Sequence, residues 1–485
     1  VEICTYNFID KKTFFRLERK ILITYNKKRK CYTYKYCTNL LKNDGGAVMG
    51  RMLPTFAAIT MLVFLLGACG GSNEAETTEE GGAEGTELTF WTFAGPHADF
   101  FENAAERWNQ ENPEKKINLK VETYPFDQMH NNLLMALQSG EGAPDIVDIE
   151  IAKFSNFLKG EVQLVPLNDV IEPEIDSFIP ERLSIYEKDG NYYGAPTHLG
   201  ATVVYYNKEI MDEAGVDIDS IATWDDYVEA GKKVVETTGK PMTTVAINWY
   251  SIWPFIVQKG SDFFDENGNL TLDNDTNIDT LSFINDWVNK YGIAEVAPGG
   301  NYHNEEFYGF MNNGGQASLI IPLFYMKDFT EYMPDLKGKM EIRLMPAWED
   351  SDNVSAPMGG TGTAITNQSE NVELAKEFLY FSKLSKEGNI RLWTELGFDP
   401  YRWDALEDPI MEEDNEYYEY FHDGIFDILL EAEDRIGSVN ITEFTPDVLS
   451  EIESNVMHNV IRENAQDPEE ALKQTADKVR EIMGQ

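Results

Sequence analysis

The stretch "LTFWTF", residues 88–93, begins an alternation of strand and helix patterns in this 485-residue chain. Its aromatic and threonine content predicts a β-strand. Residues 97–113 follow with apolar side chains three and four positions apart, which predicts a helix. The apolar face of that helix would comprise Phe100, Phe101, Ala104, Ala105 and Trp108. The sequence therefore passes from a strand into an amphipathic helix.

The same alternation continues downstream. "INLKVETYP", residues 117–125, alternates as a strand does, residues 127–145 predict a helix with a glycine stop, and "DIVDIE", residues 145–150, is a short apolar strand. This β-α-β-α-β order predicts an α/β fold with a parallel or mixed sheet and right-handed crossovers. Ligands of such sheets bind beyond the carboxyl ends of the strands. The side chains at those ends are Trp91, Thr92, Phe93, Asp148 and Glu150.

Residues 49–68 have the features of a lipoprotein signal peptide. Arg51 supplies a positive start, and the uncharged apolar core, residues 56–66, is too short for a comfortable membrane span. "LGAC", residues 66–69, resembles the lipobox of bacterial lipoproteins. That resemblance implies that Cys69 is lipidated on sulfur and becomes the first mature residue. An ordinary signal peptide that happens to end near a cysteine is the alternative.

The segments on either side of the signal peptide differ in composition. Residues 1–48 hold 11 basic and 4 acidic residues and three of the four cysteines. We interpret them as an upstream extension that precedes a translation start at Met49, with a basic nucleic-acid-binding arm as the alternative. Residues 69–87, rich in Gly, Thr and Glu, are expected to form a flexible acidic tether.

The chain from Cys69 onward is strongly acidic, with 28 basic and 80 acidic residues and a net charge of −52. This charge argues against nucleic acid and anionic lipid as partners and indicates a salty or alkaline medium. This part of the chain is longer than a domain with a single hydrophobic core usually is, so two lobes are expected. No cysteine follows Cys69, and "GGTGTA", residues 359–364, lacks the lysine of a phosphate-binding loop. We therefore expect no metal and no cofactor.

Several segments resemble, in order and spacing, the carbohydrate-binding extracellular solute-binding proteins of ABC importers, the maltose-binding-protein-like family. They are "ELTFWTF" (87–93), "PDIVDIEIAKFSNFL" (144–158), "GAPTHLGATVVYYNKEIMDEAG" (194–215), "TWDDY" (223–227), "YGFMNNGGQASLIIP" (308–322) and "VELAKEFLYFSKLSKEG" (372–388). The resemblance covers essentially residues 87–485. A smaller set is similar to the arabino-oligosaccharide-binding subfamily of Gram-positive bacteria: "YPFDQMHNNL" (124–133), "APGG" (297–300), "YMPDLKGK" (332–339) and "LWTELGFDPYRWD" (392–404).

The resemblance implies a two-lobed periplasmic-binding-protein-like fold, each lobe a mixed sheet flanked by helices, with a ligand cleft between the lobes. Lobe 1 is expected to comprise residues 88–199 and 347–383, and lobe 2 residues 202–344 and 386–485. The expected crossings between lobes lie near residues 198–203, 344–347 and 382–386. Hinge closure would capture an oligosaccharide, with an arabino-oligosaccharide favoured, and deliver it to the permease subunits of an ABC transporter. The protein would be a monomer, lipid-anchored at the extracellular face of the cell membrane, with a role in arabinan utilisation.

A sugar offers an apolar C–H face and a rim of hydroxyls, so a sugar cleft needs aromatic platforms beside polar side chains. The expected ligand-binding residues are Trp91, Phe93, Glu150, His198, Tyr206, Trp249, Tyr250, Trp253, Tyr325, Trp393, Asp399 and Arg402. Trp91 and an aromatic in residues 249–253 are the preferred stacking platforms. A core role is the alternative for each aromatic, and a structural role near the crossing is the alternative for His198. Trp224 and Trp287 are interpreted as helix packing.

A secreted glycoside hydrolase is the alternative from another class. It would also need a sugar cleft, with two carboxylates roughly 5 to 10 Å apart. In so acidic a chain, nothing in the sequence singles out such a pair, and the resemblance to a noncatalytic family implies that the protein is not an enzyme. A sugar-sensing co-receptor would share the fold and the site, and would differ only in its membrane partner.

Overall fold

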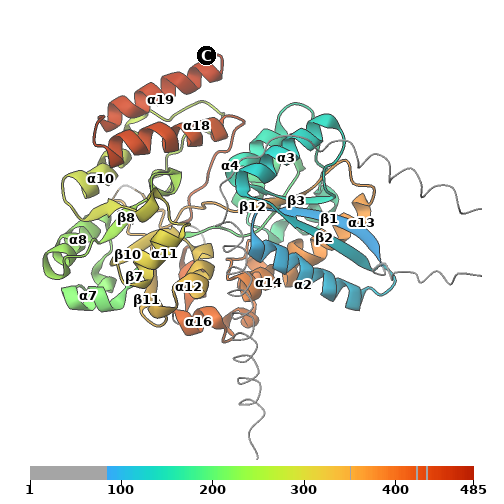
Figure 1. Ribbon diagram of the computed structural model, residues 1–485, viewed down its shortest axis with the longest axis horizontal. Coiled ribbons are helices and arrows are strands. Elements are labelled where there is room, and N and C mark those ends of the chain that lie inside the picture. The colour runs from blue at the N-terminus through green and yellow to red at the C-terminus, as the bar shows by residue number, and fades with distance from the viewer. Residues whose placement is uncertain (1–84, 350, 422–423, 433–434) are drawn as a thin grey trace, which may run out of the picture. The chain divides into compact units, whose positions relative to one another are not determined.

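The computed structural model describes residues 85–349, 351–421, 424–432 and 435–485 (Figure 1). The expected upstream extension, the signal peptide, the lipidated Cys69 and nearly all of the acidic tether lie outside these residues. Within the described ranges, no helix combines the length and the apolar character that a membrane crossing requires.

The first sheet contains the three strands expected from the sequence. β1 (Thr86–Thr92) pairs in parallel with both β2 (Ile117–Thr123) and β3 (Ile146–Glu150). β12 (Thr361–Ile365) runs antiparallel between β3 and β6 (Ala195–Pro196). The order is β2-β1-β3-β12-β6, so the sheet is mixed and the chain returns to it from far along the sequence.

Two helices cover opposite faces of this sheet (Figure 1). α2 (Gly95–Glu111) buries the predicted face, Phe100, Phe101, Ala104, Ala105 and Trp108, in one core with Leu88 and Phe90 of β1. α3 (Phe126–Ser139) packs in another core with Val147 and Ile149 of β3. It ends at Gly140, whose φ of 79° is the left-handed conformation that closes many helices.

The second sheet is built around β7 (Thr202–Asn207). This strand pairs antiparallel with β10 (Ser318–Pro322) on one side and β11 (Met340–Leu344) on the other. A parallel pair, β8 (Thr243–Val245) and β9 (Ala294–Val296), extends the region. Strands of both sheets therefore come from both halves of the chain.

Helices surround the second sheet. α8 (Trp224–Thr238) and α10 (Asp275–Asn289) bury Trp224 and Trp287, with ring centroids 5.6 Å apart, so both tryptophans serve helix packing as predicted.

The other helices of five or more described residues, in both parts of the fold, are η2 (Glu172–Ser177), α7 (Lys208–Ala214), α9 (Trp253–Gln258), α11 (Glu305–Asn312), α12 (Met326–Tyr332), α13 (Val372–Leu379), η9 (Tyr380–Leu384), α14 (Lys386–Leu396), α16 (Glu416–Tyr420), α17 (Ile425–Ala432), α18 (Thr445–Glu451), η12 (Ile452–Arg462) and α19 (Pro468–Ile482).

The chain passes between the two sheets at residues 197–201, after β6, and again within residues 345–360, between β11 and β12. The two passages lie side by side, because the Thr202 N–H donates to Ala356 O (3.0 Å) and the Met358 N–H donates to Gly200 O (2.9 Å). Ala347 still pairs with the segment before α8, through its N–H and Ala222 O. The second passage therefore adjoins the first near residues 356–358, and the expected crossings and lobe boundaries stay predictions.

Candidate ligand-binding site

Four of the aromatic residues expected to bind ligand are enclosed by protein groups, namely Tyr206, Trp253, Tyr325 and Trp393. The indole N–H of Trp253 donates to Asp262 Oδ1 at 2.7 Å, and the Tyr325 hydroxyl donates to Tyr302 O at 2.5 Å. Each of the four is at most 1% exposed. Their rings contribute to the cores, and we do not include them in the candidate site.

Arg402 is also held by protein groups. Its guanidinium forms ion pairs with Glu174 (2.6 Å) and Asp404 (2.8 Å), donates to Leu384 O (2.7 Å) and lies 4.7 Å from the centre of the Phe178 ring. Burial favours the neutral form, but the two carboxylates outweigh it and raise the pKa of Arg402. This arginine therefore ties the segment after α14 to the segment around Phe178.

Trp91 and Phe93 occupy the predicted end of β1 and are partly exposed. The Trp91 ring meets Tyr124 edge-on at 5.2 Å. The Phe93 ring lies 5.0 Å from Phe126 and 5.3 Å from His130. The strand end thus carries an aromatic group, as the sequence indicated, but with neighbours that the sequence did not identify.

Glu150 ends β3 and is buried. Its own N–H donates to His130 Nε2 (3.1 Å), and its Oε2 accepts from the Ala152 N–H (2.7 Å) at the start of α4 (Ile151–Phe154). Oε1 is buried without a hydrogen-bond partner in the described part of the chain. Burial raises the pKa of Glu150 to about 7. One oxygen of this carboxylate is therefore free to accept from a ligand.

Arg182 was missed by sequence reasoning. It lies on α6 (Pro180–Leu183), is fully buried, and donates from Nη2 to Gly359 O at 2.6 Å. Nε and Nη1 have no hydrogen-bond partner among the described residues. A signal was present, since Arg182 is the only basic residue between Lys159 and Lys188 in an acidic segment.

His198 and Asp399 meet beside the first passage between the sheets. His198 Nδ1 lies 3.8 Å from Asp399 Oδ1, and each of these two atoms is buried without a hydrogen-bond partner in the described ranges. Asp399 Oδ2 accepts from the Ala201 N–H at 2.8 Å. Burial lowers the pKa of His198 well below its usual value and raises the pKa of Asp399 to about 6. The imidazole is therefore neutral and can both donate and accept.

Aromatic rings from the other side of the passage approach these polar groups. Tyr250 stacks on Trp249 with ring centroids 3.9 Å apart, and Phe324 lies 6.4 Å from Tyr250 and 5.2 Å from His198. His303 is 6.2 Å from the Phe324 ring and nearly parallel to it. Charges of Glu150 and Arg182 also act on Tyr250, whose pKa is raised mainly by burial. Side chains that follow strands of the first sheet therefore lie close to aromatic side chains that follow strands β8 and β10.

Two glycines make this convergence possible. Gly359 and Gly360 have φ values of 65° and 100°, which side-chain-bearing residues rarely adopt. A Cβ at Gly359 would lie 2.6 Å from the Tyr250 hydroxyl, and one at Gly360 would collide with the Arg182 guanidinium. The two glycines of the "GGTGTA" segment therefore permit the close approach of Tyr250 and Arg182 to the backbone.

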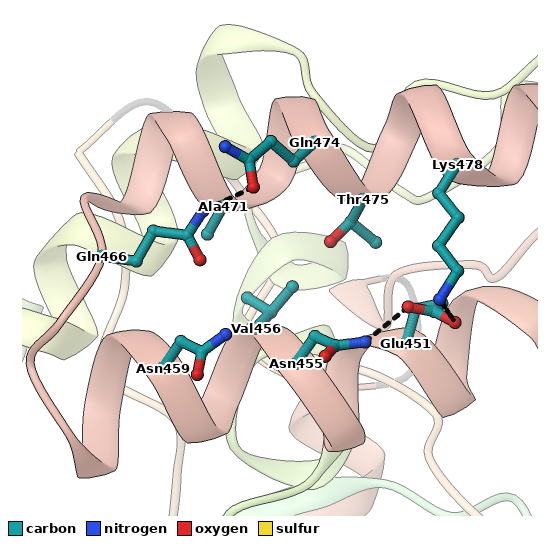
Figure 2. A pocket seen from close by; sticks show the side chains of 9 residues that line it. All are labelled: Glu451, Asn455, Val456, Asn459, Gln466, Ala471, Gln474, Thr475 and Lys478. Atoms are coloured by element: carbon teal, nitrogen blue, oxygen red, sulfur yellow. Dashed lines mark hydrogen bonds and ion pairs between the residues drawn. The ribbon is translucent and has the colours of Figure 1, made fainter.

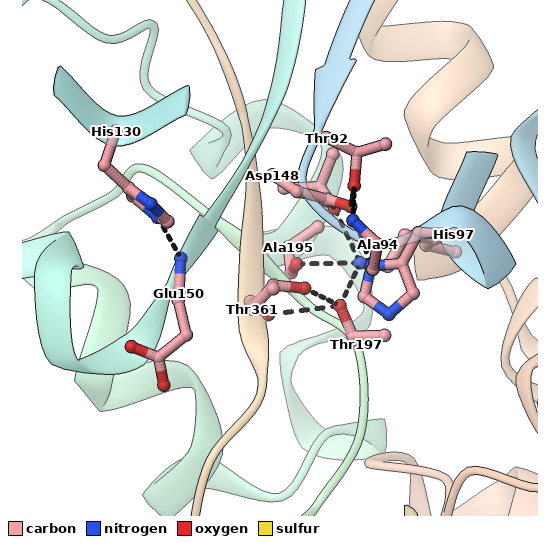
Figure 3. Close-up of polar contacts among 11 residues, drawn as sticks. Thr92, Ala94, His97, His130, Asp148, Glu150, Ala195, Thr197 and Thr361 are labelled. Carbon is pink, nitrogen blue, oxygen red and sulfur yellow. Dashed lines mark hydrogen bonds and ion pairs between the residues drawn. The ribbon is translucent and has the colours of Figure 1, made fainter. Parts of the chain in front are cut away.

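A second polar cluster lies nearby and is built around Asp148 (Figure 3). Its Oδ2 accepts from Thr92 Oγ1 (3.1 Å) and lies 2.8 Å from His97 Nδ1, and its Oδ1 accepts from Thr363 Oγ1 (2.5 Å). Burial alone would raise the pKa of Asp148, but the contact with His97 and the nearby positive charges hold it below its usual value. Both oxygens of this carboxylate are occupied by protein groups.

Lys383 completes this cluster from η9. Its ammonium donates to Thr197 Oγ1 (2.7 Å), Thr363 Oγ1 (2.6 Å) and Ala195 O (3.4 Å). Burial lowers the pKa of Lys383 to about 8, against the opposing charge of Asp148. Figure 3 shows the Glu150 carboxylate apart from this network. The first sheet therefore carries one satisfied buried cluster and, beside it, one with open donors and acceptors.

Two surface cavities lie elsewhere. One of about 250 Å³ lies between η12 and α19 (Figure 2), and another of about 230 Å³ lies beside α7 and α11. The first is lined by Glu451, Asn455, Val456, Asn459, Gln466, Ala471, Gln474, Thr475 and Lys478. None of these nine residues is aromatic, and several pair with one another, as Lys478 does with Glu451 at 2.6 Å. The convergence at Glu150 and His198 is the better candidate for a binding site.

Solved structures of sugar-binding proteins share this fold. The GacH receptor of Streptomyces glaucescens aligns with a TM-score of 0.68 and 20% identity, over 82% of this chain and 98% of that one. Maltose-bound MalE3 of T. maritima aligns with a TM-score of 0.66 and 18% identity, over 82% and 100%. The fold is the two-lobed α/β fold of periplasmic-binding proteins, with sheets flanked by helices, as predicted.

Sequence comparison defines the family. The family described as "Bacterial extracellular solute-binding protein" matches residues 94–386. The arabinooligosaccharide-binding protein of Halalkalibacterium halodurans is 56% identical over 401 residues, which is 82% of this chain and 90% of that protein. The arabinooligosaccharide-binding protein of Bacillus subtilis is 45% identical over 437 residues, 89% of this chain and 100% of that protein. The chain belongs to the bacterial extracellular solute-binding protein family.

Proposed function

We propose that this protein captures a neutral oligosaccharide, an arabino-oligosaccharide in first place, between its two lobes and delivers it to an ABC importer. The observation that carries the proposal is the set of buried side chains with open hydrogen-bonding atoms, Glu150, Arg182, His198 and Asp399, beside the rings of Tyr250 and Phe324. The names of the two relatives reported above, both arabinooligosaccharide-binding proteins, support the choice of sugar.

Each of these groups has a role suited to a sugar. Glu150 and Asp399 accept hydrogen bonds from hydroxyls, Arg182 donates to hydroxyl oxygens, and neutral His198 does both. Tyr250 and Phe324 offer ring faces to the apolar C–H face of the sugar. Because these residues follow both sheets, a hinge rotation would enclose the sugar and exclude water. The transporter would then distinguish the loaded form from the empty one.

Anchoring and assembly complete the proposal. The protein is a monomer that is lipidated at Cys69 and held at the extracellular face of the cell membrane through the acidic tether. This anchor raises the local concentration of the loaded protein near the permease subunits. Intact-mass measurement of the membrane fraction should find a lipidated N-terminus at Cys69, and Cys69→Ala should release the protein. Peptides from residues 1–48 in native cells would contradict a start at Met49.

A thermal-shift screen followed by isothermal titration tests which sugar the protein binds. Arabino-, xylo-, malto- and galacto-oligosaccharides are added to the purified protein, and a ligand that binds only the folded state raises the melting temperature. We expect the largest shift with arabino-oligosaccharides and unchanged sugars after long incubation. Absence of a shift with every sugar contradicts sugar capture, and shorter products would support the hydrolase alternative.

A further inference from the structure

The groove between η12 and α19 has no part in the function proposed above (Figure 2). It has a volume of about 250 Å³. Val456 and Ala471, which line it, are each 1% exposed, whereas Asn455 and Gln474 are exposed to solvent. Four of its nine lining residues are asparagine or glutamine, and we refer to these nine residues as the amide groove. The amide groove therefore combines an accessible polar rim with a floor of short apolar side chains.

The charges of the amide groove are compensated within it. Glu451 and Lys478 are the charged residues among the nine. Lys478 Nζ lies 2.6 Å from Glu451 Oε1, and the Asn455 amide donates to Glu451 Oε2 at 2.6 Å. A charged ligand group would lose hydration here without gaining an unpaired opposite charge. The groove therefore suits a neutral polar ligand.

Open hydrogen-bonding groups face the space between the two helices. Gln466 Nε2 donates to Gln474 Oε1 at 2.9 Å, and Figure 2 shows the Gln466 carbonyl oxygen and the Thr475 hydroxyl directed between the helices. Thr475 is 5% exposed. In the described part of the chain, Gln466 Oε1, Thr475 Oγ1 and the Asn459 amide have no hydrogen-bond partner. The groove thus offers both donors and acceptors.

The backbone of η12 is a second, independent feature of this surface. η12 is a π-helix of 11 residues, and the Glu463 N–H that follows it donates to His458 O, five residues back, at 3.0 Å. π-Helices are rare, and those that occur are frequently found at functional sites. The wide helix carries Asn455 and Asn459 on its side toward the groove.

The residue types of the amide groove favour a peptide backbone as ligand. An asparagine or glutamine amide can accept from the N–H and donate to the C=O of a peptide unit, and short floor side chains let a backbone approach. A sugar would lack the aromatic platform that it prefers, because none of the nine residues is aromatic. The volume is also below the roughly 300 Å³ at which pockets begin to enclose small molecules. The occupant is therefore part of a longer chain.

We propose that the amide groove binds an extended, uncharged segment of a partner protein through hydrogen bonds to its backbone. Small side chains such as glycine and serine suit this segment, since they leave the backbone accessible. Each side-chain amide that is removed should weaken binding about fivefold. The amide groove shares no residue with the candidate sugar site, so an arabino-oligosaccharide should not displace the segment.

The test is a nuclear magnetic resonance titration of the purified protein with the peptide acetyl-Gly-Ser-Gly-Ser-Gly-Ser-amide. The backbone amide resonance of Thr475 is the reporter, and it should shift with a dissociation constant of about 1 mM or lower. Asn459→Ala and Gln466→Ala should each weaken binding about fivefold. Ser454→Ala is the control, since Ser454 is an exposed residue of η12 outside the nine, and it should bind as the wild type does.

A second peptide tests the role of the backbone without any change to the protein. Replacing each glycine by N-methylglycine removes N–H donors, and this peptide should bind the wild type at least about fivefold more weakly. Equal binding of both peptides, or no shift with either, would overturn the proposal. A Thr475 shift caused by arabinotriose and lost in Asn459→Ala would assign the groove to sugar and would also overturn it. Neither result would alter the assignment of Glu150 and Asp399.

Discussion

The two buried polar clusters beside the first sheet differ in one respect. Asp148 and Lys383 have their hydrogen-bonding atoms occupied by His97, by threonines and by a carbonyl. Glu150 and Asp399 each use one oxygen on a backbone N–H and leave the other open among the described residues. Burying a polar atom without a hydrogen-bond partner costs free energy, and binding a ligand that supplies the missing partner is one reason for such an atom to be present. The first cluster stabilises the fold, and we assign the second to binding.

The largest effect is expected from Lys383→Met, which would break the satisfied cluster. Removing the ammonium takes away a buried positive charge that acts on the Asp148 carboxylate and the donor that bonds Thr197 and Thr363, and losing one partner of a buried charged cluster costs about 3 to 5 kcal/mol. Urea unfolding should report this loss in the free energy of unfolding. The affinity of the remaining folded protein for arabino-oligosaccharide should stay within about threefold of the wild type, well under 1.4 kcal/mol. A variant as stable as the wild type would show that the cluster is not structural.

A pH-dependent effect should distinguish Glu150→Gln from the wild type. The pKa of Glu150 is raised by burial from 4.5 to about 7, so the folded state holds its proton where the unfolded state has released it. The contribution of Glu150 to the free energy of unfolding is fully present below pH 4.5 and is lost as the pH rises through about 7. The variant lacks this loss.

The stability advantage of Glu150→Gln should therefore grow across that window, to at most about 3 kcal/mol, and stay flat above it. Urea unfolding of both proteins at a series of pH values gives the difference, in which the other titrating groups cancel. A difference that is independent of pH would mean that Glu150 is ionised with an ordinary pKa.

Tyr250→Ala should weaken the open cluster from its aromatic side. Truncating a well-packed aromatic at a binding site costs about 2 kcal/mol or more, which corresponds to roughly thirtyfold in affinity. Trp91→Ala should cost at least about tenfold. Isothermal titration measures both. The control is Trp224→Ala, which should lower the melting temperature and leave the affinity of the folded protein nearly unchanged; equal affinity losses in all three variants would remove the assignment.

The smallest effect concerns the whole surface rather than either cluster. The chain from Cys69 onward carries a net charge of −52, and salt screens the repulsion between exposed charges. Raising the salt concentration from millimolar to molar should raise the melting temperature by a few degrees, as calorimetry can record. A flat or falling curve would mean that local ion pairs already neutralise the acidic surface.

The part of the site that could be predicted from the sequence is the part set by local pattern. Alternation and helical spacing predicted β1, β2 and β3, and with them the strand ends that carry Trp91 and Glu150. Arg182 could not be assigned, because its partner, the Gly359 carbonyl, lies 177 residues away and is brought there by the return of the chain through β12. A side chain that acts across such a distance has no local signature beyond its isolated charge.

Aromatic residues show a second limit of prediction from the sequence. Trp253 and Tyr250 stand three positions apart in the same segment, yet Trp253 donates to buried Asp262 while Tyr250 faces Phe324 and Gly359. Large rings bury similar area in a core and in a binding site, so residue type does not separate the two roles. Packing against distant elements decides between them, and that information appears only with the structure.

The most direct test of the two-cluster account compares Asp148→Asn with Glu150→Gln by isothermal titration with an arabino-oligosaccharide and by urea unfolding. The measurement is made at about pH 8.5, above the Glu150 pKa of about 7, so that the wild-type carboxylate is ionised. Asp148→Asn should lose about 3 kcal/mol of stability or more and keep its affinity. Glu150→Gln should be at least as stable as the wild type and bind about tenfold more weakly or worse, because hydrogen bonds to a charged group contribute about 1.5 to 3 kcal/mol. Binding that survives Glu150→Gln and is lost in Asp148→Asn would contradict the account.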